Sequence, residues 1–155
     1  MIFDKQAQFS NAQDLQGLTG SQPSEQTIDL GTNRGADLTP AQYQIGKGKP
    51  VRIRCQVTET FVDDSGTNGT VNVQLQTDGS INGSSQLLSG NTIAETGAIA
   101  VTALVQGYEF DIDFVPKRNV ERYIALNYVI ATMTPTAGKI TAGIVLDEQQ
   151  NHFGE

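Results

Sequence analysis

The sequence of 155 residues contains no tryptophan, one cysteine and one histidine. A single cysteine excludes an intramolecular disulfide, and Cys55 and His152 are too few to build a zinc site or to activate a serine nucleophile. The HExxH and GxSxG motifs are also missing, as is a phosphate-binding glycine loop before a helix. We therefore expect no catalytic, cofactor-binding or metal-binding residues, and no enzymatic activity.

Basic residues are scarce: 10 Lys and Arg face 17 Asp and Glu, which gives a net charge of −7. Nucleic acid is therefore not an expected partner, because binding a phosphate backbone requires a basic surface. The sequence has no uncharged apolar run of about 18 residues and no basic start followed by an apolar segment. We expect neither a membrane span nor a signal peptide, and we expect synthesis in a cytoplasm.

What the sequence does contain is 16 glycines and many short runs in which apolar and polar residues alternate. This two-residue period is typical of β-strands. We predict an all-β fold, a jelly-roll β-sandwich of about seven or eight antiparallel strands, ahead of an immunoglobulin-like sandwich. The expected organisation is an N-terminal arm at 1–26, a jelly-roll domain at 27–147 and a polar C-terminal tail at 148–155. Cys55 alternates in phase with apolar residues and is expected to be a buried thiol.

Residues 120–147 are the most regular stretch and predict a hairpin around a turn at 132–138. The best register places Ile124 opposite Leu146, and Ile130 opposite Ile140, with the large side chains on one face. The turns at 63–69 and 78–85 are expected to join further strands, with a short strand at 86–89. The first of these turns superficially resembles a calcium loop but lacks its distal glutamate.

The other face of the predicted hairpin carries Ala125, Val129, Gly143 and Val145, none of which is charged. A solvent-facing strand would alternate with clearly polar residues, so this face is expected to be covered. Either a loop of the same chain or a neighbouring subunit covers it. These four residues are the candidate oligomer interface.

The segment 1–26 is polar and rich in glutamine, with few apolar anchors. Phe3 and Phe9 are the two aromatic ones. The segment is either a loose terminus or an arm that docks on its own domain or on a partner. Phe3 and Phe9 are therefore the candidate docking residues.

Two groups of charged residues allow a functional and a simpler interpretation. The one basic cluster consists of Lys47, Lys49, Arg52 and Arg54. It is either a solvated strand face, which we favour, or a surface for an acidic neighbour. Asp111 and Asp113 share a strand face as a glycosidase pair does, but a charged outer face gives the same pattern more often.

Several stretches resemble the capsid cement proteins of tailed phages, in the family first described from a Bordetella phage. The similar stretches are MIFDK at 1–5, FSNAQ at 9–13, TIDLG at 27–31, VNVQLQT at 71–77, GY at 107–108, RYIALNY at 122–128 and TAGKITAGIVLD at 136–147. The resemblance implies a jelly-roll subunit that forms a homotrimer, binds the major capsid protein at local three-fold positions and stabilises the shell. It implies a virion protein on the outer surface of the capsid, made in the host cytoplasm.

The alternative is a jelly-roll module of a phage fibre that binds a carbohydrate or a receptor. Such modules commonly present an aromatic platform, for which a chain with no tryptophan and four tyrosines offers little material.

Overall fold

The computed structural model of the protein describes residues 5–31, 51–63, 66, 68–114 and 120–145. These residues form nine strands and two single 3₁₀ turns. The strands are β1 (Gln8–Asp14), β2 (Gly20–Pro23), β3 (Ile28–Asp29), β4 (Val51–Asp63), β5 (Thr70–Asp78), β6 (Asn91–Ala100), β7 (Glu109–Phe114), β8 (Tyr123–Ala131) and β9 (Pro135–Val145). The turns are η1 (Lys5–Ala7) and η2 (Val101–Ala103). The predicted all-β class is confirmed.

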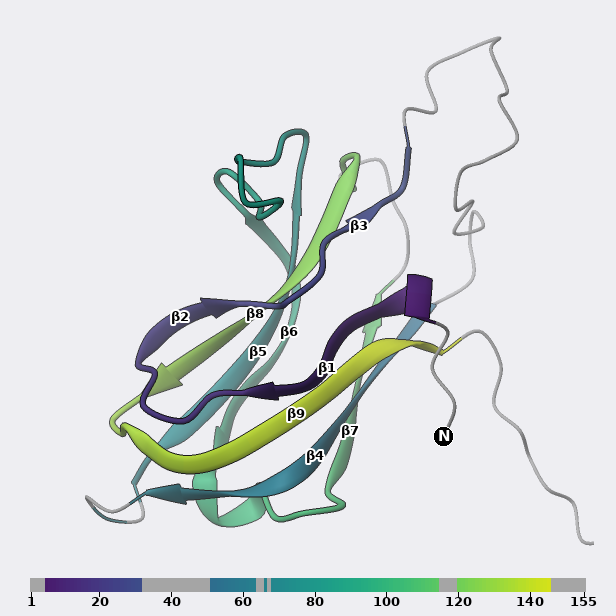
Figure 1. The fold of residues 1–155 in the computed structure, drawn as a ribbon. Helices are drawn as coiled ribbons and strands as arrows, with labels where there is room; N and C mark the ends of the chain where they lie inside the picture. Colours follow the sequence, from purple (N-terminus) through teal and green to yellow (C-terminus); the bar gives the residue numbers. More distant parts are fainter. Residues whose placement is uncertain (1–4, 32–50, 64–65, 67, 115–119, 146–155) are drawn as a thin grey trace, which may run out of the picture.

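The strands form two sheets that face each other (Figure 1). One has the order β1-β9-β4-β7, and the other has the order β2-β8-β5-β6, with β3 also paired to β8. All these pairings are antiparallel. β2 and β3 can be counted as one interrupted strand, because both pair with β8. The pairing then proceeds inward from the two ends of the chain: β1 pairs with β9, β2 and β3 with β8, β4 with β7, and β5 with β6. A doubled chain wrapped into two sheets in this way is a jelly roll, so that prediction is confirmed.

The predicted hairpin at 120–147 is wrong. β8 pairs with β2, β3 and β5, whereas β9 pairs with β1 and β4, so the two strands lie in different sheets. The chain crosses between the sheets after Ala131, where Thr132 adopts a φ of 62°. The large side chains of both strands do face each other, but across the interior. Alternation identifies which face of a strand is buried, and it says nothing about the strand's partner.

The turn expected at 63–69 does not form a hairpin either, because the strands before and after it lie in different sheets. β4 belongs to the four-stranded sheet and β5 to the five-stranded one. β5 and β6, by contrast, are consecutive strands that pair within one sheet, and they are joined by residues 79–90.

The core lies between the sheets and is built from the inward-facing residues of the long strands. It includes Ile53, Cys55, Val57, Val71, Val73, Leu75, Ile124, Leu126, Tyr128, Ile130, Ile140, Ala142 and Ile144. Cys55 is a free buried thiol, as expected. Burial raises its pKa, because the charged thiolate is disfavoured away from water.

The described part of the N-terminal segment is built into the sandwich, so the boundary that separated an arm at 1–26 from the jelly roll is wrong, and of the three alternatives the segment docks on its own domain. β1 pairs with β9, and β2 pairs with β8. Phe9 and Leu15 are fully buried in the core. The alternation is hidden because β1 has two register shifts in seven residues and Ala12 has a φ of 50°. Such bulges rotate side chains out of the two-residue period.

Tyr128 ties this N-terminal strand to the opposite sheet. Its hydroxyl lies 2.8 Å from Ser10 Oγ on β1, and both residues are fully buried. Ser10 Oγ donates its single hydrogen to Gln13 Oε1 at 2.6 Å. Tyr128 is therefore the donor to Ser10. Gln13 in turn donates to the carbonyl oxygen of Pro23 at 2.9 Å, which extends the network to β2.

We expect Tyr128→Phe to lower the free energy of unfolding by about 0.5–1.5 kcal/mol, because it removes one buried hydrogen bond and keeps the ring. Urea denaturation measures this difference. Tyr123→Phe is the matched control, since Tyr123 is only half-buried and its hydroxyl makes no hydrogen bond within the described residues. Equal effects of the two substitutions would contradict a stabilising role for the Tyr128 bond.

Candidate functional site

The four candidate interface residues do not form one surface. Ala125 and Val129 lie on the outer face of β8 in the five-stranded sheet, and Gly143 and Val145 lie on the outer face of β9 in the four-stranded sheet. These outer faces point in opposite directions, because the sheets pack through their inner faces (Figure 1). The shared face inferred from the hairpin is therefore wrong. That each residue contacts another subunit stays a prediction.

The same chain covers part of these positions. Ala125 is 4% exposed and lines a cleft together with Leu87 and Leu88 of the segment that joins β5 to β6. Gly143 is buried and pairs with Arg54 on one side and Gln8 on the other. For Ala125, the covering is thus a loop of the same chain. Val129 and Val145 are half-buried.

Phe9 is not an exposed docking residue. Its side chain has no exposed area and belongs to the core, where the segment around it pairs with β9. Removing it from the core would break up β1. Phe3 lies outside the described residues.

A ladder of ion pairs and hydrogen bonds covers part of the four-stranded sheet's outer face. Arg54 Nε and Nη2 donate to the two carboxylate oxygens of Asp111 at 2.8 and 3.1 Å. Arg52 Nε donates to Asp113 Oδ1 at 3.1 Å. Gln56 Nε2 donates to Glu109 Oε1 at 3.1 Å. Each of these is a directly opposed pair of β4 and β7.

This ladder shows where both groups of charged residues lie. The acidic neighbour of Arg52 and Arg54 is strand β7 of the same chain. Asp111 and Asp113 lie on the charged outer face that the sequence favoured over a glycosidase pair. Partly exposed pairs of this kind contribute only about 0–1 kcal/mol each, so their main effect is to fix strand register. Lys47 and Lys49 lie outside the described residues.

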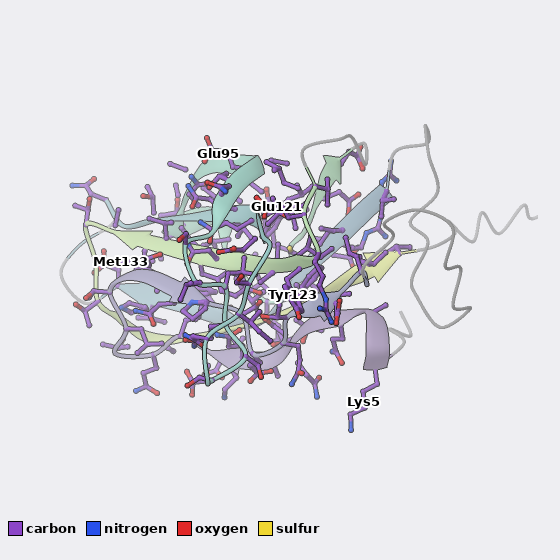
Figure 2. The ribbon with its side chains drawn as sticks, turned by 90° about the horizontal axis from the view of Figure 1, so that it is seen from above. Lys5, Glu95, Glu121, Tyr123 and Met133 are labelled. Atoms are coloured by element: carbon purple, nitrogen blue, oxygen red, sulfur yellow. The ribbon has the colours of Figure 1, made fainter. Side chains whose placement is uncertain are left out.

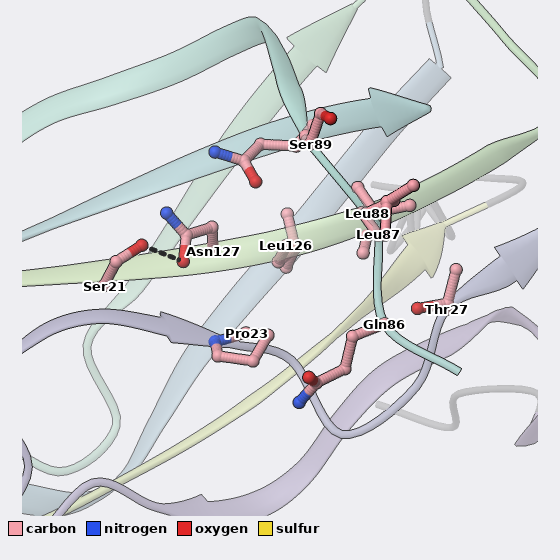
Figure 3. Close-up of a pocket in the computed structure, with 12 residues that line it drawn as sticks. Ser21, Pro23, Thr27, Gln86, Leu87, Leu88, Ser89, Leu126 and Asn127 are labelled. Atoms are coloured by element: carbon pink, nitrogen blue, oxygen red, sulfur yellow. Dashed lines mark hydrogen bonds between the residues drawn. The ribbon is translucent and has the colours of Figure 1, made fainter. Parts of the chain in front are cut away.

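The outer face of the five-stranded sheet is mainly uncharged and amide-rich. Ser21 Oγ donates to Asn127 Oδ1 at 2.8 Å (Figure 3). Asn127 Nδ2 donates to Gln74 Oε1 at 3.3 Å, and Gln74 Nε2 donates to Glu95 Oε2 at 3.1 Å. This chain of bonds crosses from β2 through β8 and β5 to β6. Glu95 is the one carboxylate in this chain of bonds. Its pKa is lowered because the side chains of Asn72 and Gln74 donate hydrogen bonds to it. Figure 2 shows Glu95 on the side of the molecule opposite to Lys5.

Asp78 at the end of β5 fixes the segment that follows. Its Oδ2 accepts hydrogen bonds from the backbone N–H groups of Ser89 at 2.6 Å and Gly90 at 3.1 Å, and its Oδ1 accepts one from Ser80 at 3.0 Å. These bonds lower the pKa of Asp78, with the Ser89 bond as the largest cause. We call residues 79–90 the Asp78 loop. Asp78, Gly79 and Ser80 indicated a turn here. That the Asp78 carboxylate binds both ends of the loop could not be predicted from the sequence.

An open cleft of about 190 Å³ lies between the Asp78 loop and the sheet beneath it (Figure 3). Its walls include Pro23 and Thr27 from the N-terminal segment, Gln86 and Leu87 from the loop, and Asn127 from β8. Small-molecule sites usually measure roughly 300–1,000 Å³. The cleft is therefore sized for one side chain or a few water molecules.

In the part of the chain that the structure describes, no group of three or more His, Cys, Asp and Glu could hold a metal ion. The described residues also include no helix long and apolar enough to cross a membrane.

A comparison with curated proteins found no match to the sequence. The Bbp16 family matches residues 9–144, from the start of β1 almost to the end of β9, so the match spans both sheets of the sandwich. In agreement with the resemblance to a Bordetella phage protein family, the chain belongs to the Bbp16 family.

Proposed function

We propose that the protein is a structural virion protein that binds the outer surface of a tailed-phage capsid as a homotrimer and stabilises the shell. Its partners in this proposal are the major capsid protein and two further copies of itself. The proposal assigns it no catalytic step.

The observation that carries the proposal is the Bbp16 family match over both sheets of a jelly roll, taken together with the resemblance to phage cement proteins. The internal ion pairing of the structure agrees with a structural role. The described arginines Arg52, Arg54 and Arg122 bond to carboxylates of the same chain, the last of them to Asp29 at 2.7 Å. Partners therefore meet a surface on which these charges are already paired.

Stabilisation of a shell follows from binding alone. A protein that binds the assembled shell, and not its separated subunits, stabilises the shell by about 2.7 kcal/mol per site when its free concentration is a hundred times its Kd. Many sites repeat over a capsid lattice, so modest affinity at each one produces a large total effect. Trimer formation adds to this, because three linked contacts raise the effective affinity.

The experiment mixes the purified protein with capsids that lack it. We expect the protein to sediment with the capsids and to raise the temperature at which the shells break open. Light scattering of the free protein is expected to give the mass of three chains. Heat-unfolded protein at the same concentration is the control for non-specific protection. Folded protein that neither sediments with the capsids nor protects them would exclude the cement function.

A further inference from the structure

Asparagine is followed directly by glycine at two places in the chain, Asn68–Gly69 and Asn82–Gly83. In such a pair the backbone nitrogen of the glycine can attack the amide carbon of the asparagine side chain, since the ring that closes has five atoms and glycine has no Cβ to obstruct it. The structure favours this reaction in two ways. It leaves the glycine backbone free to approach the amide, and it stabilises the negative charge that develops on the amide oxygen.

The glycine backbone is free in one pair and held in the other. Gly83 is exposed in the Asp78 loop, with open space where a Cβ would lie, and its N–H donates no hydrogen bond within the described residues. Gly69 is buried. A Cβ added there would lie 2.7 Å from Met133 Cγ, and the Gly69 carbonyl oxygen accepts a hydrogen bond from the Val101 N–H at 2.9 Å. Movement of Gly69 toward Asn68 therefore requires these contacts to break.

The amide oxygen of Asn82 also faces two hydrogen-bond donors. Asn82 Oδ1 accepts hydrogen bonds from the backbone N–H groups of Ser84 at 2.9 Å and Gln86 at 3.0 Å. The Asn82 N–H in turn donates to the carbonyl oxygen of Gln86 at 2.8 Å, which holds these donors in place. Two fixed backbone donors polarise a carbonyl group and stabilise an oxyanion that forms on it. The Asn68 amide makes no hydrogen bond within the described residues.

We propose that Asn82 is a site of spontaneous deamidation in the folded protein. The Gly83 nitrogen forms a bond to Asn82 Cγ, the bond between Cγ and Nδ2 breaks, and the Gly83 proton leaves with the amide as ammonia. The product is a five-membered cyclic imide. Solvent water then opens this ring at either of its carbonyl carbons, which leaves aspartate or isoaspartate at position 82. Neither step oxidises or reduces the protein, and the product carries one negative charge more than the net charge of −7.

The two products affect the Asp78 loop differently. Aspartate keeps an oxygen where Asn82 Oδ1 lies, and its negative charge strengthens the hydrogen bonds from Ser84 and Gln86. Isoaspartate adds one carbon atom to the main chain between positions 82 and 83. The longer main chain disturbs the bridge between Ile81 and Leu87. Deamidation therefore changes the charge of this surface loop in both products and its backbone in one of them.

The experiment incubates the folded full-length protein at mildly alkaline pH and follows both Asn-Gly pairs in the same sample by mass spectrometry of its peptides. We expect Asn82 to deamidate about tenfold or more faster than Asn68, because both the free glycine and the two donors favour Asn82. A second sample in concentrated urea is the control for the sequence itself. There we expect similar rates at the two pairs, since neither keeps its contacts in the unfolded chain.

Gly83→Ala tests the attacking group. The φ of Gly83 is not in the left-handed region and its Cβ position is open, so the variant should unfold at the same temperature as the unaltered protein. We expect deamidation of Asn82 to become about tenfold slower or more, because the added Cβ obstructs ring closure. The rate at Asn68 should stay the same.

Three results contradict the proposal. Deamidation of Asn68 as fast as that of Asn82 in the folded protein would mean that the structure does not select between the pairs. An Asn82 that reacts in urea and stays intact in the folded protein would mean that the Asp78 loop protects the amide. Equal rates at Asn82 in Gly83→Ala and the unaltered protein would exclude the Gly83 nitrogen as the attacking group.

Discussion

Replacing Phe9 with alanine lowers the free energy of unfolding by about 3–5 kcal/mol, because a fully buried ring leaves a cavity that the surrounding core fills only in part. Domains are typically stable by roughly 5–15 kcal/mol, so this one change removes a large fraction of the total. Urea denaturation followed by fluorescence of the tyrosines measures it. Leu88→Ala is the control, since Leu88 is mostly exposed and its truncation leaves no cavity.

The result decides between two roles for the N-terminal segment. A loss of less than about 1 kcal/mol in Phe9→Ala would mean that the ring is not packed in the core, and a docking arm would again be the better description. The structure also changes how such an arm is tested. Deletion of residues 1–12 removes most of β1 and exposes the edge of β9, so lost capsid binding after that deletion would reflect a damaged sheet.

Leu126→Ala is expected to lower the free energy of unfolding by about 2–5 kcal/mol. Leu126 is 1% exposed, on the inner face of β8, a strand with partners on both sides. The matched control is Thr141→Ala on the outer face of β9. Its hydroxyl accepts a hydrogen bond from the Ala12 N–H at 2.8 Å. Losing this bond should lower the free energy of unfolding by about 0.5–1.5 kcal/mol.

Chemical denaturation of both variants gives the order of the two effects. Should Thr141→Ala prove the more harmful, the inner and outer faces of β8 and β9 would have to be exchanged. The expected cost at Thr141 is larger than a solvent-facing threonine would give, because its hydroxyl holds the irregular part of β1.

The sequence predicted the faces of the strands better than their partners. Alternation placed Leu126 and Ile140 inside, and both are buried. The same alternation suggested that β8 pairs with β9, although each strand pairs in a different sheet. Both arrangements bury the same side chains, so the hydrophobic pattern cannot distinguish them.

The candidate surfaces were less predictable for two physical reasons. Arg54 and Asp111 are 57 positions apart, and their pairing depends on the register between β4 and β7. Phe9 lies in a strand whose bulges remove the alternation that would have shown it to be buried. In both cases the missing information is long-range backbone geometry, which local residue patterns do not contain.

The central position of β9 has a consequence for the order of folding. β4 pairs with β7, and β5 with β6, through contacts that a growing chain can make early. β1 has β9 as its one partner strand in the described structure, and β9 also fills the place beside β4. The four-stranded sheet therefore cannot close until the last described strand has been synthesised. Contacts between residues so distant in sequence slow folding, and until then the exposed edges of β1 and β4 must avoid pairing with other chains.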